Sequence, residues 1–340
     1  MTTQEIKLPI TAAVPFQAYQ IRGFEAAILL AHDESTEKFL FNSCINCYLR
    51  EKESGNPLFD YTCNYTSWFA GQDVFCFQTI PIDVKETTKE SLTVRVREYL
   101  RHGIYVSGSF NEKYIPHKNA YGRRDFKHSF LLYGYDQAEQ IFYAIGYTDN
   151  AKFELYQIAY SDFANGILNV EKPALLLRYF RPDTKLELNL QRIYEELGDY
   201  LHSDYTVNHG TGKNRNDLYG IRAHHAFRSY IARYGQSGKF LDVRHSRFFY
   251  ENKDFMQKRL SYLHQKGYIS DYSEQYAIVA QKSKTIHLLF LKYNMTLCTN
   301  SLKAIDRLLE EVNQLDEEIL VSVYEELTAW FKQKKQEVYL

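Results

Sequence analysis

Two neighbouring segments, HSFLLYGYD at residues 128–136 and QIFYAIGYTD at residues 140–149, decide the fold that the sequence predicts. Both are rich in apolar and aromatic residues, and the polar loop between them is short enough for a hairpin. IYVSGSF at 104–110 and FELYQIAY at 153–160 have the same character. Together they predict an antiparallel sheet.

Helical patterns surround the predicted sheet. TKESLTVRVREYLRHG at 88–103 offers Thr88 or Ser91 as an N-cap and Gly103 at its C-terminal end, which predicts a helix. EKFLFNSCINCYLREK at 37–52 has apolar residues at helical spacing and predicts a second helix, which carries Cys44. AYQIRGFEAAILL at 18–30 fits either a strand or a short helix.

The pattern changes near residue 175. The composition shifts around KPALLLRYFRPDTK, and from about residue 185 long helical segments follow one another to the C-terminus. A chain of 340 residues also suits two domains better than one core. We therefore expect an α+β domain at 1–175 and a mostly helical domain at 176–340.

Composition excludes several classes of protein. A net charge of -1 argues against a surface that binds nucleic acid. No apolar run reaches the roughly 18 residues of a membrane helix, and the N-terminus lacks the pattern of a signal peptide, so we expect a cytoplasmic protein that does not bind membranes. The 29 Tyr and 22 Phe fit either an aromatic-lined cleft or a bulky core.

The cysteines and histidines do not predict a metal site. Cys44 and Cys47 have no second pair at zinc-ligand spacing, because Cys63 and Cys76 are irregularly placed. His224 and His225 are adjacent on a predicted helix, so they cannot face one ion together. HGTGKNRND at 209–217 lacks the spacing of a phosphate-binding loop. We expect neither a metal nor a bound cofactor.

The hairpin can also be interpreted as part of a catalytic site. His128 begins one strand, and Asp136, Asp149 and Asn150 follow across the hairpin. Since neighbouring strands lie about 4.8 Å apart, a residue late in the second strand can reach the imidazole and fix its tautomer. Cys44 on its predicted helix is a candidate thiolate nucleophile, with Cys47 as the weaker choice. The alternatives are a histidine that satisfies a core hydrogen bond and cysteines that only pack.

The order Cys, His, Asp is the papain-like one. HSFLLYGYD followed by IFYAIGYTDNAKFELYQIAYSDF resembles the His-hydrophobic-Gly-Tyr-Asp hairpin of the butirosin-biosynthesis acyltransferase family, which is related to papain-like cysteine peptidases. LYGIRAHHAF and LDVRHSRFFYENKDFMQKRLSYL are similar to the helical half of related proteins encoded beside nonribosomal peptide and polyketide clusters. The resemblance spans most of the chain and implies a papain-like first domain with a helical domain that covers its cleft.

The resemblance also implies an activity in natural product biosynthesis. A cysteine, here Cys44, would accept an acyl group from the phosphopantetheine thioester of an acyl or peptidyl carrier protein, and a small amine would then displace it to form an amide. His128 would be the base and Asp149 the acid. The loop residues Tyr114, Tyr121 and Phe126 are expected to shield the acyl-enzyme from water.

The stretch 211–250 carries eight basic and two acidic residues, six net positive. Arg222 and Arg228 within it are our candidates for binding an acidic carrier protein and its phosphate, although a solvated helix face is an equal interpretation. Two other functions remain open: a cysteine peptidase or amidase, and a noncatalytic binding protein of a biosynthetic cluster.

Overall fold

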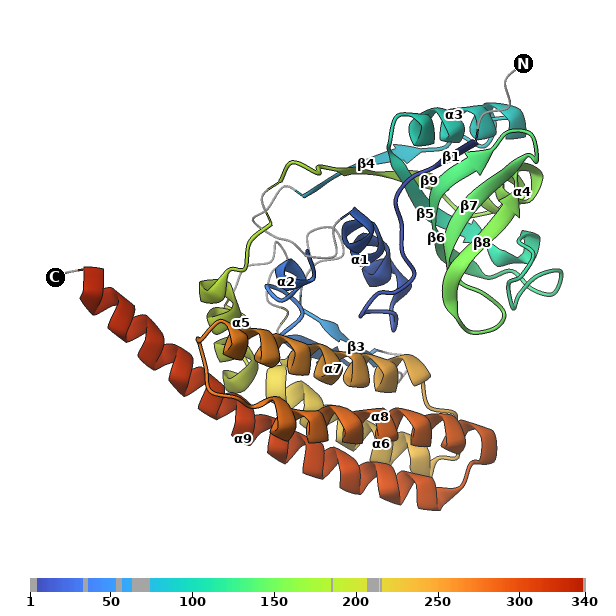
Figure 1. Cartoon of the computed structure of the whole chain (residues 1–340). Helices are drawn as coiled ribbons and strands as arrows, with labels where there is room; N and C mark the ends of the chain where they lie inside the picture. The colour runs from blue at the N-terminus through green and yellow to red at the C-terminus, as the bar shows by residue number, and fades with distance from the viewer. Residues whose placement is uncertain are drawn as a thin grey trace. The chain divides into compact units, whose positions relative to one another are not determined.

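The computed structural model describes residues 5–32, 36–52, 57–62, 74–184, 186–206, 214 and 216–338. It is a mixed α and β fold, about 52% helical, with a large antiparallel sheet (Figure 1). The chain forms two compact units: unit 1 comprises Met1–Thr36 and Gly71–Lys185, and unit 2 comprises Glu37–Ala70 and Leu186–Leu340. This division differs from the expected continuous domains, because residues 37–70 interrupt unit 1 and belong to unit 2.

The sheet of unit 1 confirms the predicted hairpin and its antiparallel neighbours. Its strands follow one another in the order β4 (Phe75–Pro81), β9 (Ala174–Phe180), β5 (Tyr105–Asn111), β6 (Lys127–Asp136), β7 (Ile141–Tyr147) and β8 (Phe153–Ala159), and β1 (Glu5–Lys7) also pairs with β6. Gly134 allows β1 to approach, since a β-carbon there would lie 2.2 Å from the carbonyl oxygen of Ile6. The KPALLLRYF segment, where we expected a domain boundary, supplies β9.

Helices cover both faces of this sheet. One face packs against α3 (Lys89–Arg101) and α4 (Tyr160–Leu168), with Phe130 of β6 and Phe163 of α4 in the core between them. The N-cap of α3 is Thr88, as predicted, and its hydroxyl accepts a hydrogen bond from the Ser91 amide at 3.1 Å. The helix α1 (Gln20–His32) lies against the opposite face, where buried Glu25 and Arg178 form an ion pair at 2.8 Å.

The helix predicted across residues 37–52 is wrong. Only α2 (Glu37–Leu40) is helical; a turn follows, and β2 (Cys47–Arg50) begins at Cys47. β2 pairs with β3 (Leu58–Tyr61) and with β10 (Asp217–Tyr219), and Arg50 binds Asp217 across the β2–β10 ladder at 2.6 Å. These strand partners override a local pattern that also fits a helix.

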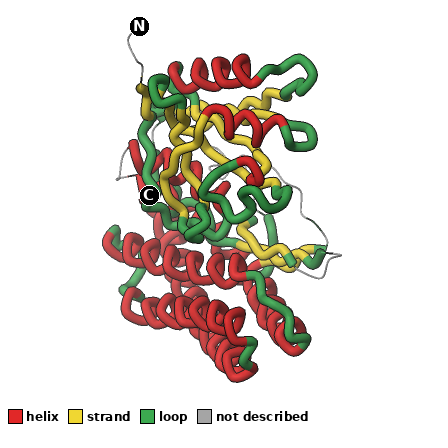
Figure 2. The backbone as a smooth tube through the Cα atoms, turned by 90° about the vertical axis from the view of Figure 1, so that its right-hand side faces the viewer, coloured by secondary structure: helices red, strands yellow, loops and turns green. Residues whose placement is uncertain are grey.

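From residue 186 on, the described part of unit 2 is mostly helical, as predicted. Its helices are α5 (Leu190–His202), α6 (Gly220–Gln236), α7 (Val243–Gln265), α8 (Ser273–Thr296) and α9 (Thr299–Val338). The helices α7, α8 and α9 pack side by side (Figure 2). In the described part of the chain, no helix has both the length and the apolar character needed to cross a bilayer.

Candidate functional site

A histidine–carboxylate pair stands at the start of β6. His128 lies opposite Phe110 of β5, and its Nδ1 is 2.6 Å from Oε1 of Glu112. Glu112 opens the short 3-10 turn η2 (Glu112–Tyr114), which directly follows β5. The His128 side chain is 31% exposed, whereas that of Glu112 is 6% exposed. A buried carboxylate therefore holds a half-buried imidazole.

The base of the loop between β5 and β6 fixes this geometry. The Asn111 side chain accepts hydrogen bonds from the amides of Lys113 at 3.2 Å and Phe126 at 3.1 Å. The Glu112 amide donates to the carbonyl oxygen of Phe126 at 2.8 Å. The two ends of the loop are thus joined on either side of Glu112, which limits the positions that its carboxylate can take.

Asp149 is not the acid that binds His128. It lies exposed in the turn after β7, where its amide donates to the carbonyl oxygen of His117 at 2.8 Å. We predicted the partner on the strand after His128, but the structure supplies it from the strand before. The register that pairs Phe110 with His128 brings residue 112 close to the histidine, and the sequence spacing alone does not give that register.

A buried lysine, Lys118, lies within electrostatic range of Glu112. The Lys118 ammonium donates to the carbonyl oxygen of Tyr147 and stands 4.0 Å from the ring centroid of Tyr156. Burial lowers the pKa of Lys118 to about 8, although the charges of Glu112 and Asp149 oppose that shift. Lys118 thus brings positive charge to the buried side of Glu112 without contacting His128.

The aromatic loop contributes one neighbour to His128. The Phe126 ring is exposed, and its centroid lies 5.6 Å from that of the imidazole. Tyr121 is exposed and Tyr114 lies half-buried in η2. Three aromatic residues were proposed as a shield. Among the described residues of the loop, Phe126 is the one whose ring contacts that of His128.

This arrangement can carry out proton transfer. Because Nδ1 donates to a carboxylate, the neutral imidazole keeps its lone pair on Nε2. A half-exposed Nε2 can take a proton from a substrate, and the Glu112 carboxylate stabilises the imidazolium that forms. The pair therefore has the geometry of an oriented general base.

Cys44 belongs to unit 2, in a turn rather than at a helix N-terminus. It is buried, its φ is +62°, and its carbonyl oxygen accepts a hydrogen bond from Arg259 at 3.5 Å. The helix on which we predicted Cys44 ends at Leu40, so the described residues 41–46 are not helical. Since Cys44 and His128 lie in different units, their predicted contact stays a prediction.

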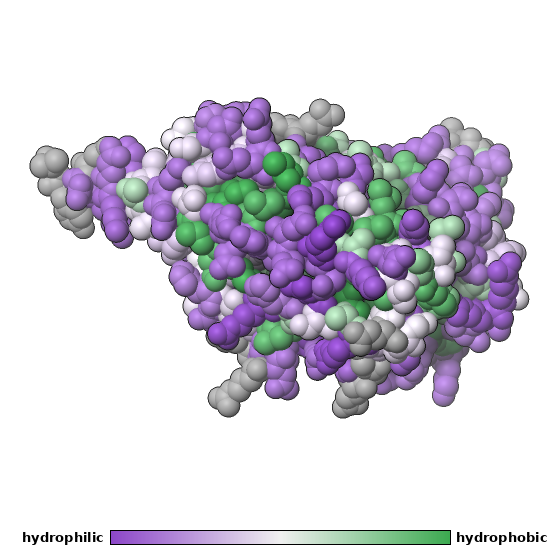
Figure 3. All heavy atoms as spheres, turned by 90° about the horizontal axis from the view of Figure 1, so that it is seen from below, coloured by the Kyte–Doolittle hydropathy of each residue, from purple (hydrophilic) through white to green (hydrophobic). Residues whose placement is uncertain are grey.

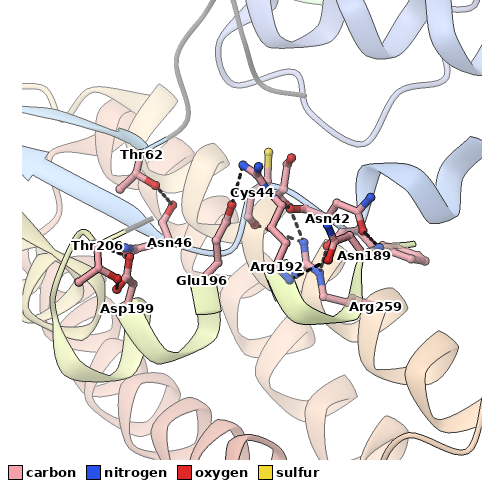
Figure 4. Close-up of polar contacts among 12 residues, drawn as sticks. Asn42, Cys44, Asn46, Thr62, Asn189, Arg192, Glu196, Asp199, Thr206 and Arg259 are labelled. Atoms are coloured by element: carbon pink, nitrogen blue, oxygen red, sulfur yellow. Dashed lines mark hydrogen bonds and ion pairs between the residues drawn. The ribbon is translucent and has the colours of Figure 1, made fainter. Parts of the chain in front are cut away.

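Polar contacts fix the turn around Cys44 (Figure 4). The Arg259 guanidinium donates to the carbonyl oxygens of Phe41 at 2.9 Å and Ser43 at 2.7 Å. The Asn42 amide accepts from the Asn189 amide nitrogen at 2.6 Å, and Asn46 donates to the carbonyl oxygen of Asp204 at 2.8 Å. These contacts to α7 and to both ends of α5 hold the left-handed conformation of Cys44 in place.

The other cysteines are weaker nucleophile candidates. Burial raises the pKa of Cys47 to about 12, and its thiol lies 3.9 Å from the carbonyl oxygen of Gly220, so it stays protonated at neutral pH. Cys76 lies on β4, three strands away from β6, or roughly 14 Å at the spacing of neighbouring strands. Cys298 is exposed in unit 2, and Cys63 lies outside the described residues.

The basic stretch 211–250 is largely neutralised. Arg228 binds Asp306 at 2.6 Å and Glu310 at 3.2 Å, which argues against its role in binding a carrier. Three further arginines also have acidic partners: Arg233 with Glu51, Arg244 with Asp242, and Arg247 with Glu251. Arg222 is exposed at the start of α6 and stays a candidate, whereas Lys213 and Arg215 lie outside the described residues.

His224 and His225 are separated as the helix spacing predicts: His224 is buried, with Nδ1 3.2 Å from the Tyr200 hydroxyl, and His225 is exposed. Across the described ranges, no three His, Cys, Asp or Glu side chains are grouped to hold a metal ion.

Comparison with protein-family models gives no matching family, and comparison with curated proteins gives no match either.

Proposed function

We propose that the protein transfers an acyl group from a carrier-protein thioester to an amine, and that His128, held by Glu112, is the general base. The 2.6 Å contact between a half-exposed imidazole and a buried carboxylate is the observation that carries this proposal. The carrier, the amine and the papain-like relationship rest on the resemblance of the hairpin and helical segments to the butirosin-biosynthesis acyltransferase family.

The reaction forms an amide and breaks a thioester. The neutral amine attacks the acyl carbonyl carbon through its nitrogen. His128 Nε2 takes a proton from that nitrogen as the C–N bond forms. The C–S bond then breaks, and the proton passes from the imidazolium to the leaving thiolate. The products are the amide and the free thiol of the phosphopantetheine arm, so atoms and charges balance without a cofactor.

Two routes supply the acyl group. In the route implied by the resemblance, Cys44 first accepts the acyl group as a thioester. In the second route, the amine attacks the carrier thioester directly, because a thioester is already activated. The second route needs no thiol beside His128, and the single cysteine of unit 1, Cys76, lies three strands from that histidine.

The test is amide formation from an acylated carrier protein and a panel of amines, followed by mass spectrometry. Replacing the base in His128→Asn should slow amide formation by about 10²–10⁴-fold. His102→Asn is the matched control, because His102 is an exposed histidine at the C-cap of α3 in the same unit. Equal rates for wild type and His128→Asn would refute the proposal.

The same assay distinguishes the routes and the alternatives. A covalent acyl adduct on the intact protein that disappears in Cys44→Ala indicates the acyl-enzyme route, whereas full activity of Cys44→Ala indicates direct transfer. Free acid in place of amide indicates a peptidase or amidase.

A noncatalytic binding protein is the second candidate. It is favoured by the buried turn in which Cys44 lies, where a helix was predicted. Carrier binding without amide or acid would support this candidate.

A further inference from the structure

Helix α8 has apolar residues on two faces. One face is buried against α7 and α9 and includes Val279, Ile286 and Phe290. Ile278, Leu288, Leu291 and Met295 lie on the exposed side, and Met295 is 85% exposed. A surface helix of a globular protein normally has a polar outer face. The exposed side of α8 therefore carries large apolar residues among polar ones, where solvent contact would favour polar residues alone.

A second apolar residue is held beside the end of this face. The Leu241 amide donates to the Asn294 side chain at 2.9 Å, and the Tyr293 hydroxyl donates to the carbonyl oxygen of Lys239 at 3.3 Å. Phe240 lies between these anchored residues and is 68% exposed. We call the set Phe240, Leu288, Leu291 and Met295 the α8 patch.

Hydrogen bonds fix the backbone of the loop, so the exposure of Phe240 is imposed by the fold. Apolar areas also reach the surface among hydrophilic residues on the face seen from below (Figure 3). Exposed apolar residues gathered on one side of a helix commonly mark an interaction site.

The C-terminal part of α8 itself carries charge of one sign, although α9, which packs against it, carries acids such as Glu311. From residue 275 to residue 298 the sequence contains three lysines and no acidic residue. Lys282 binds Glu311, whereas Lys284 and Lys292 are exposed and have no ion-pair partner recorded among the described residues. Lys239, also exposed, adds a third such charge beside Phe240. This contrasts with the arginines of 211–250, which are mostly paired.

We propose that the α8 patch is the docking site for the acidic carrier protein of the proposed reaction. The complement of an apolar stripe flanked by unpaired lysines is an amphipathic helix with acidic residues beside its apolar face. Phe240 and Met295 supply the central apolar contact, and Lys239, Lys284 and Lys292 steer the partner and fix its register. The inference rests on the proposed function for the identity of the partner.

The test measures binding of a phosphopantetheinylated acyl carrier protein by titration calorimetry. The double variant L288E/M295E places two negative charges in the patch and should raise Kd by at least about tenfold. I278E is the matched control, because Ile278 is an exposed apolar residue near the other end of the same helix. It should leave Kd within about twofold of wild type. Since all three side chains are exposed, the variants should fold, which circular dichroism checks.

A small acyl donor allows the docking site and the proposed reaction to be tested separately. Acyl-pantetheine needs no protein docking, so L288E/M295E should use it at the wild-type rate while losing transfer from the acylated carrier. If neither donor yields amide but carrier binding still depends on the patch, the docking site stands and the acyltransferase does not.

Three results would overturn the docking site. One is wild-type affinity of L288E/M295E for the carrier. Another is patch-dependent binding to vesicles of phosphatidylcholine and phosphatidylglycerol in place of the carrier. The third is a wild-type dimer that the double variant converts to monomer, because a second copy would then occupy the patch.

Discussion

The pair Glu112–His128 in unit 1 and the pair Lys253–Asp316 in unit 2 show two uses of opposite charge. Lys253 Nζ lies 2.9 Å from Asp316, and both side chains are 1% exposed. The hydroxyls of Tyr200 and Tyr276 also donate to Asp316, and Tyr200 contacts His224. Each of the helices α5 to α9 contributes one member of this network.

The two pairs differ in whether a polar atom remains available to a substrate. Every Asp316 oxygen has a donor within the bundle, so the unit 2 pair can stabilise the packing of five helices but has no face for a substrate. His128 has one nitrogen bound and a half-exposed ring. Burying only the acid partner keeps the base oriented while leaving it reachable, which is the arrangement expected of a reactive group.

The largest expected effect is on the buried pair. Lys253→Met should lower the free energy of unfolding by about 3–5 kcal/mol, because it leaves the Asp316 carboxylate buried without its cation. Urea denaturation of the variant and the wild type measures this. A loss below about 1 kcal/mol would show that the tyrosine hydroxyls alone satisfy Asp316.

Next in size is a pH effect at the buried lysine of unit 1. The pKa of folded Lys118 is about 8, below the ordinary value of 10.5, so between these values the unfolded chain binds more protons than the folded one. The contribution of Lys118 to stability therefore rises with pH across this window, by about 3 kcal/mol. The difference in unfolding free energy between wild type and Lys118→Met should rise from pH 8 to pH 10.5, and parallel curves would contradict it.

A smaller effect is expected when the acid partner of His128 loses its charge. Glu112→Gln keeps an oxygen acceptor for Nδ1 but cannot neutralise the imidazolium. The rate of amide formation should fall by about 10- to 100-fold, less than on removal of the base itself. Single-turnover kinetics with saturating carrier isolates this step. Asp149→Asn, which changes an exposed acid, should leave the rate unchanged; the reverse ranking would restore Asp149 as the acid.

The smallest effect belongs to an exposed pair on the same helix as Lys253. Lys258 lies 3.7 Å from Glu37, and the two side chains are 49% and 45% exposed. Lys258→Met should change the free energy of unfolding by less than about 1 kcal/mol, since water screens such pairs. A loss equal to that of Lys253→Met would mean that burial does not explain the difference between the two pairs.

The elements predicted correctly from sequence are those set by local pattern. These elements are the antiparallel hairpin at 128–149, the capped helix that begins after Thr88 and the long C-terminal helices. In each, the pattern of apolar residues within a short stretch indicates the type of secondary structure. His128 was singled out because its position at the lip of a strand is also local information.

The errors concern partners that are distant in sequence. Cys44 lies in a turn, because β2 is held by β10, about 170 residues later. Glu112 was missed because the choice between acids depends on strand register rather than on spacing. The net positive charge of residues 211–250 suggested a basic surface for a carrier protein. Arg228 and Arg233 instead bind acids on other segments, Asp306 and Glu51. Local sequence contains none of these pairings.

The interrupted path of the chain has a consequence for synthesis. Strand β2 leaves the ribosome early, but its neighbour β10 follows only after the remainder of unit 1 has been made. At about 5–20 residues per second this delay lasts roughly 10–30 s. During that time β2 has no β10 to pair with, although unit 1 can already complete its sheet. Unit 1 is thus the part that can fold first, and unit 2 can form only after the helices α5 to α9 have been made.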